Sequence, residues 1–300
     1  MQKKQHRSHL HYLLLAPAIA IATVVLRTLA LLTRFDAETG FYTDPTFSLI
    51  TTLLLLLSTV AMAIFSYEMR PHFSFCRDYR DLPSLFAGVF LAIALVFFGV
   101  TMLAELPVES PSLLLVSLLP VIFAFAGAVL FAVRAFDGSA EGGAKAMLTL
   151  PLAAFGVFYA LYLSMENTLL LNAPQKVIAI TAWIAAAFFF LGEARIALGR
   201  AKWALHTFST VVTIIFTATL SIPNLAYQAV AGTPLLGNTA HDFVALGVCL
   251  YALAGLITTV SSAIRKKATG VDRLTETEAA TPEKANNSEV GKDDEEATDR

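Results

Sequence analysis

Charged residues are scarce in this sequence. Asp, Glu, Lys and Arg make up 15% of its 300 residues, whereas 56% are hydrophobic. Soluble domains contain about 25% charged residues, so the composition excludes an ordinary water-soluble fold. Cysteine is also rare, with only Cys76 and Cys249 in the whole chain. We expect these two at different membrane depths, which argues against a disulfide framework and a cysteine-rich metal site.

The common enzyme and pump motifs are absent as well. The sequence contains no His-Glu-x-x-His, Gly-x-Ser-x-Gly, Walker A or Gly-x-Gly-x-x-Gly pattern, and no nucleic-acid-binding motif. These absences argue against common hydrolases, nucleotide-driven pumps and nucleic-acid partners. We expect no cofactor and no metal, and an unfamiliar intramembrane enzyme ranks third among the functional hypotheses.

Long apolar runs fill most of the chain instead. A hydrocarbon core of about 30 Å is crossed by about 20 helical residues, and a helix satisfies its own backbone polar groups there. The sequence therefore predicts an all-α polytopic transmembrane bundle of about eight spans within residues 1–267. The predicted spans lie near residues 10–33, 48–67, 84–104, 112–134, 147–165, 176–198, 205–227 and 241–264.

Basic residues occur in alternate gaps between these runs. Positively charged flanks stay cytoplasmic, so the pattern predicts that both termini are cytoplasmic. The opposite gaps hold little basic charge beyond Arg34 and Lys176. The basic gaps contain Lys3, Lys4, Arg7, Arg70, Arg77, Arg80, Arg134, Lys145, Arg195, Arg200, Lys202, Arg265, Lys266 and Lys267.

A cleavable signal peptide is the alternative interpretation of the first run. The chain has a basic start and small residues at Ala18, Ala20 and Ala22. However, the apolar stretch that starts at Leu13 continues to Leu32, which is longer than a usual signal-peptide core. A retained first span is favoured.

The final segment, residues 268–300, has a different composition. It carries ten acidic and four basic residues, whereas residues 1–267 carry 13 acidic and 17 basic residues. So polar and acidic a segment cannot bury enough apolar surface to offset the entropy of ordering. The sequence predicts a disordered acidic cytoplasmic tail.

Arg27 is the first candidate site residue, because it lies inside a predicted span. A cation in a membrane helix usually faces protein, water or a counter-ion, although a long side chain can also reach the headgroups. If it pairs, we expect a carboxylate in the same outer half, with Glu166 preferred over Glu105 and Asp242.

The seventh predicted span carries a polar stripe. At 100° per residue its members share one face, and Pro223 beside Asn224 is expected to free backbone carbonyls. The stripe either lines a solute path or packs helices through hydroxyl hydrogen bonds. Its members are His206, Thr210, Thr213, Thr217, Ser221 and Asn224.

The fifth predicted span carries an aromatic stripe of Phe155, Tyr159 and Tyr162 that ends at Glu166. These residues either belong to the aromatic belt at the membrane interface or form an external vestibule with Arg27. Glu193 and Arg195, near the inner end of the sixth span, are expected at the interface.

Residues 27–42 include the end of the first predicted span. The part that leads out of the span is Thr33-Arg34-Phe35-Asp36-Ala37-Glu38-Thr39-Gly40-Phe41-Tyr42. This segment resembles the opening of uncharacterised multi-pass membrane proteins of Gram-positive anaerobic bacteria. The resemblance implies a bacterial inner-membrane location and no named activity. Locally, Asp36 is expected to cap a turn and Gly40 to allow a tight bend.

The leading functional prediction is a permease for a small solute or ion, in contact with the lipid bilayer. The alternative is a non-transporting membrane sensor or scaffold that acts through its cytoplasmic tail or a partner protein. The residues predicted to bind the solute or line its path are Arg27, Tyr159, Tyr162, Glu166, Thr210, Thr213, Thr217, Ser221 and Asn224.

Overall fold

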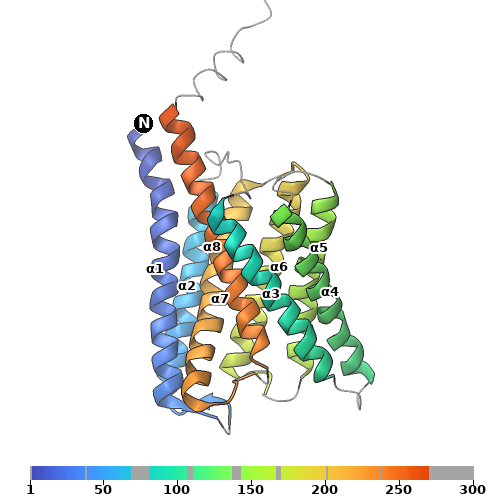
Figure 1. Cartoon of the computed structure of the whole chain (residues 1–300). Coiled ribbons are helices and arrows are strands. Elements are labelled where there is room, and N and C mark those ends of the chain that lie inside the picture. The colour runs from blue at the N-terminus through green and yellow to red at the C-terminus, as the bar shows by residue number, and fades with distance from the viewer. Residues whose placement is uncertain are drawn as a thin grey trace, which may run out of the picture.

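The computed structural model describes residues 2–37, 39–68, 81–106, 111–136, 143–166, 170–200, 202–236 and 238–269. Within these residues the chain forms eight long helices arranged as a bundle (Figure 1). Their bounds are α1 Gln2–Arg34, α2 Pro45–Glu68, α3 Leu82–Ala104, α4 Pro111–Phe136, α5 Gly143–Met165, α6 Pro174–Ala197, α7 Trp203–Ala231 and α8 Ala240–Thr269.

Each of the eight helices contains an apolar segment long enough to cross a membrane. The predicted all-helical class is therefore confirmed, and the helices begin and end close to the predicted spans. The largest shifts are extra turns at the start of α1 and at the end of α8, where the chain leaves the apolar segment but stays helical. Residues 270–300 of the predicted acidic tail, and Cys76, lie outside the described residues.

Helices α7 and α8 occupy the centre of the bundle. In their apolar segments 78% and 72% of the residues are buried, against 28% for α1 and 22% for α2. Helix α7 contacts α1, α2, α6 and α8, whereas α3 packs against both α4 and α8. Many large apolar side chains of the outer helices are exposed on the outer surface of the bundle, as is expected of helices that face lipid.

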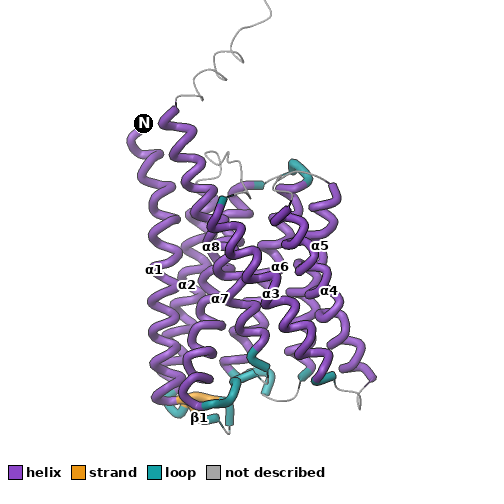
Figure 2. Tube along the Cα trace, in the orientation of Figure 1, coloured by secondary structure: helices purple, strands orange, loops and turns teal. Residues whose placement is uncertain are grey.

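Both described ends of the chain lie at the same end of the bundle, which we call the terminus end (Figure 1). The opposite end carries the strand pair β1 Phe35–Asp36 and β2 Phe41–Tyr42, and we call it the hairpin end (Figure 2). From the charge pattern we predict that the terminus end is cytoplasmic.

The strand pair explains why residues 35–42 contain turn residues. Gly40 has a φ of 73°, and its amide donates to the carbonyl of Asp36 at 2.9 Å. The Asp36 carboxylate accepts a hydrogen bond from the hydroxyl of Thr39 at 2.9 Å. The predicted bend and cap are confirmed, but the sequence did not predict the strands. An edge-to-face contact between Phe35 and Tyr227 docks the hairpin on α7, with ring centroids 5.5 Å apart.

Asp44 fixes the start of α2 next to this hairpin. Its carboxylate accepts the backbone N–H of Thr46 at 2.9 Å, which satisfies one of the free amides of the first turn. This hydrogen bond lowers the pKa of Asp44 below its ordinary value. The sequence Asp44-Pro45 thus sets the boundary between the hairpin and α2.

Helices α5 and α6 approach each other closely at Gly156. A Cβ atom built on Gly156 would lie 2.6 Å from the main-chain oxygen of Trp183. Glycine is therefore needed here, and the contact holds the indole of Trp183 edge-to-face against Tyr159, with ring centroids 5.3 Å apart. The aromatic stripe of α5 is in this way fixed inside the bundle.

Candidate functional site

Arg27 lies at the centre of a buried polar cluster near the hairpin end. Its side chain extends from α1 and is only 1% exposed. Nη2 donates to Oε1 of Gln175 on α6 at 2.5 Å and to Oδ1 of Asn224 on α7 at 2.9 Å. Nη1 donates to the main-chain oxygens of Thr219 and Leu220. One guanidinium therefore joins three helices.

Pro223 makes one of these contacts available. In a regular helix the carbonyl of Thr219 accepts the amide of residue 223, but proline has no N–H to donate. Arg27 fills this position, because its Nη1 donates to the freed oxygen. The sequence predicted that Pro223 frees a carbonyl, and the structure shows what binds it. Thr219 and Thr23 also join α7 to α1, with their hydroxyl oxygens 2.8 Å apart.

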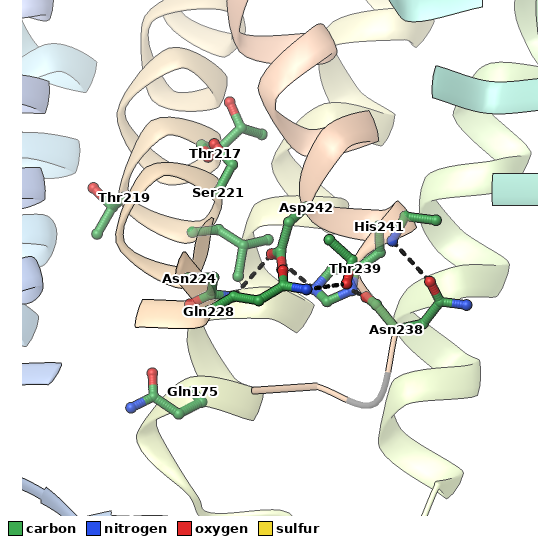
Figure 3. Close-up of polar contacts among 12 residues, drawn as sticks. Gln175, Thr217, Thr219, Ser221, Asn224, Gln228, Asn238, Thr239, His241 and Asp242 are labelled. Carbon is green, nitrogen blue, oxygen red and sulfur yellow. Dashed lines mark hydrogen bonds and ion pairs between the residues drawn. The ribbon is translucent and has the colours of Figure 1, made fainter. Parts of the chain in front are cut away.

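Asn224 extends the cluster to α8. Its Nδ2 donates to Oδ1 of Asp242 at 2.9 Å, so its amide lies between the guanidinium of Arg27 and the carboxylate of Asp242. Nε2 of His241 lies 3.1 Å from the same carboxylate oxygen, and Nδ1 of His241 lies 2.6 Å from the main-chain oxygen of Asn238 (Figure 3). We call these residues, Arg27, Gln175, Asn224, His241 and Asp242, the hairpin-end cluster.

Three buried polar atoms of this cluster have no hydrogen-bond partner in the described part of the chain. They are Nε of Arg27, Nε2 of Gln175 and Oδ2 of Asp242. A buried group left unpaired costs about 1–3 kcal/mol, so such groups are rare in packed interiors. Their concentration in one place marks this cluster as a candidate binding site rather than helix packing alone.

The expected ion pair between Arg27 and Glu166 is wrong. Among the described residues the Arg27 guanidinium donates to amide and carbonyl oxygens, and it reaches the carboxylate of Asp242 through Asn224. Glu166 follows the end of α5, where its main-chain oxygen accepts a hydrogen bond from Lys176. Gln175 of α6 and Asn224 of α7 lie beside the guanidinium in place of a carboxylate. The expected pair was chosen by membrane depth alone, which does not show which helices surround Arg27.

Tyr159 joins the hairpin-end cluster through His241. Its side chain is 1% exposed, and its ring centroid lies 6.1 Å from that of His241. It also stacks on Phe155 and Tyr162, at centroid distances of 5.7 and 5.8 Å. So buried a ring does not belong to an interfacial aromatic belt, whereas Tyr162 is only half-buried.

A second cluster of buried ionisable residues lies toward the terminus end. Nη1 of Arg134 donates to the hydroxyl of Tyr251 at 2.6 Å, and Nη2 donates to Thr149 at 3.2 Å. Glu193 completes the cluster, with one carboxylate oxygen 3.8 Å from Arg134 and the other 3.2 Å from Nε2 of His206. We call these five residues, from α4, α5, α6, α7 and α8, the terminus-end cluster.

This second cluster was not predicted from the sequence. Glu193 was expected at the interface, yet its side chain is fully buried, and Arg134 is only 6% exposed. The available signal was that both residues lie inside apolar segments, where ionisable side chains need a partner. Arg195, which shares the end of α6 with Glu193, lines a surface cleft.

The polar stripe of α7 runs between the two clusters. Thr210, Thr213, Thr217 and Ser221 are all buried, and every hydroxyl donates to a main-chain oxygen. Thr213 bonds across to Ala185 of α6 at 2.9 Å, whereas the other three bond back to the preceding turn of α7. These hydrogen bonds are those of the helix-packing alternative. The path-lining role of the stripe stays a prediction.

Eight helices that can each cross a membrane, with large apolar side chains on their outer faces, define a multi-pass integral membrane protein. Comparison of the chain with protein-family models, curated proteins and solved structures finds no match. The resemblance of residues 27–42 to membrane proteins of Gram-positive anaerobes stays a prediction. Function is therefore inferred from the two clusters.

Proposed function

We propose that this protein is a proton-linked ion permease. In this proposal the pairs Asp242–His241 and Glu193–His206 bind and release protons. The two pairs lie near the two ends of the buried polar stripe of α7. The observation that carries it is the presence of two buried carboxylate–imidazole contacts toward opposite ends of the bundle. One lies within α8 near the hairpin end, at 3.1 Å, and the other joins α6 to α7 near the terminus end, at 3.2 Å.

The energetic cost of these groups supports a functional role. An ionisable side chain at the centre of a membrane helix costs at least about 2.5–3.5 kcal/mol, and such residues commonly mark ion pathways and proton relays. Imidazole exchanges protons near neutral pH, and a neighbouring carboxylate can share the proton. Helix packing alone could be achieved at lower cost by apolar side chains of similar size.

The spacing of the two clusters also supports transport. His206 and Asn224 are separated by 18 positions of α7, which is about 27 Å at 1.5 Å per residue. This length is close to the thickness of a hydrocarbon core. The hydroxyls of Thr210, Thr213 and Thr217 lie between them. Each donates one hydrogen bond to a carbonyl but keeps lone pairs that can accept one.

A small transported species fits the packing along α7. Thr210, Thr213, Thr217 and Ser221 are at most 3% exposed, and none of them lines the cleft that His206 and Ser209 border. Because the polar stripe is so closely packed, protons and small ions fit along it better than an organic solute. At the hairpin end, the unpaired Oδ2 of Asp242, beside the imidazole of His241, is a suitable first contact for a proton or an ion.

The test is proton flux in liposomes that contain the purified protein and a trapped pH-sensitive dye. Na⁺, K⁺ and Cl⁻ gradients are applied in turn. We expect flux that exceeds that of empty liposomes for at least one ion and that is abolished by Asp242→Asn and by Glu193→Gln. Thr181→Val is the matched control, because the Thr181 hydroxyl only bonds back to Val177 on α6. Absence of flux with every gradient would contradict the proposal.

The sensor or scaffold alternative is favoured by one observation. The hydroxyls of the α7 stripe all donate to main-chain oxygens, as residues that only pack helices do. Under this alternative the carboxylate variants would lower the unfolding midpoint while wild-type liposomes would show no flux. The same experiment therefore separates the two functions.

A further inference from the structure

A cleft separates α6 and α7 on the outer surface of the bundle, near the terminus end. It has a volume of about 200 Å³. Its exposed rim includes Phe188, Leu191 and Leu205, whose side chains are 61%, 43% and 54% exposed. Because these apolar side chains face outward from membrane-crossing helices, the cleft opens toward the lipid.

Small residues create this cleft. Ala185 and Gly192 on α6 face Ser209 on α7, so no large side chain fills the space between the two helices. Gly192 also permits the close approach of His206, because a Cβ at position 192 would lie 2.6 Å from Nδ1 of His206. The cleft is thus a hollow with apolar walls rather than a gap between poorly packed helices.

Two cations lie at the terminus end of this cleft. Arg195 lies near the end of α6, and Lys202 lies just before the start of α7. Neither side chain forms a salt bridge within the described part of the chain. Glu193, the neighbouring carboxylate, is directed inward to Arg134 and His206. The positive end of the α7 helix dipole adds to the attraction for an anion.

We propose that this cleft binds an anionic phospholipid. An acyl chain would lie along the apolar walls, and the phosphate would contact Arg195 and Lys202. Basic pockets between membrane helices are typical sites for anionic headgroups. The order of the groups supports a lipid: apolar walls open to the bilayer, with cations only at the end where a headgroup would lie. This proposal is independent of ion transport.

The test is native mass spectrometry of the full chain in detergent, titrated with phosphatidylglycerol or with phosphatidylcholine of the same acyl chains. We expect phosphatidylglycerol to bind more tightly. The double variant Arg195→Gln/Lys202→Gln should lose about thirtyfold in affinity, which corresponds to about 1 kcal/mol for each basic side chain. Equal binding of the two lipids, or an unchanged double variant, would overturn the proposal.

Further variants separate this site from general attraction to a basic surface. Arg200→Gln is the matched control, because Arg200 is exposed in the same α6–α7 connection but does not line the cleft. It should leave the affinity unchanged. Ser209→Leu keeps the charge but fills the cleft, and it should also abolish the lipid preference. Normal helicity and an unchanged unfolding midpoint check that each variant folds.

Two other occupants give distinct results in the same spectra. Oleate that displaces phosphatidylglycerol at equal concentration would mean a fatty-acid site. A dimer peak that disappears on addition of lipid, and that Ser209→Leu weakens, would mean that the cleft joins two copies of this chain. Either result would overturn the phospholipid assignment.

Discussion

Nη2 of Arg27 and Oδ1 of Asn224 lie 2.9 Å apart, which joins the peripheral helix α1 to the central helix α7. The same amide donates from Nδ2 to Asp242 of α8. Asn224 is therefore the residue through which a buried cation and a buried carboxylate interact without direct contact.

Replacement of Asn224 by leucine tests this bridge. The variant keeps the side-chain size but removes two hydrogen bonds to ionisable groups, each worth about 1.5–3 kcal/mol. We expect the free energy of unfolding to fall by at least about 3 kcal/mol, measured by circular dichroism during denaturant titration in detergent micelles. Thr181→Val, which loses one exposed hydroxyl on α6, is the control. Equal stability of the two variants would show that the bridge contributes little.

Arg27→Lys tests the geometry of the guanidinium. Lysine keeps the charge, but its single nitrogen cannot reproduce the planar fork that reaches Gln175, Asn224 and the Thr219 carbonyl together. We expect the variant to insert but to lose about 1.5–3 kcal/mol of stability. If the lysine variant unfolds at the wild-type midpoint, charge alone holds the hairpin-end cluster together.

Tyr251→Phe tests the terminus-end cluster. The phenol oxygen accepts a hydrogen bond from Arg134 at 2.6 Å, so its removal leaves a buried donor without that acceptor. We expect a loss of about 1–3 kcal/mol in unfolding free energy. Tyr162→Phe is matched in chemistry but affects a half-buried ring, and it should have a smaller effect. A larger effect at Tyr162 would contradict the importance of Arg134.

Membrane orientation is tested by cysteine labelling of intact cells in a background without Cys76 and Cys249. Thr39→Cys in the hairpin and Asn172→Cys before α6 should react with an impermeant maleimide, because both positions are exposed at the hairpin end. Arg200→Cys at the terminus end should react only after permeabilisation. The reverse pattern would overturn the predicted cytoplasmic location of the termini.

The helices and one free hydrogen-bond acceptor were predictable from the sequence, because both depend on local properties. Apolar run length gave the eight spans, and the missing N–H of Pro223 predicted a freed carbonyl near the end of α7. The partners of each side chain were not predictable in the same way. Arg134 and Tyr251 are 117 positions apart, and nothing in helical periodicity indicates that α4 and α8 bring them together.

Infrared difference spectroscopy tests the central claim most directly, because it detects proton binding by individual carboxylates. Spectra of the protein in lipid are recorded as the pH is changed. The absorption band of protonated carboxyl groups is then compared between wild type and the variants Asp242→Asn and Glu193→Gln. Proton binding at the two pairs predicts that each variant lacks one pH-dependent component that the wild type shows. Spectra in which both variants retain every titrating component would contradict the claim.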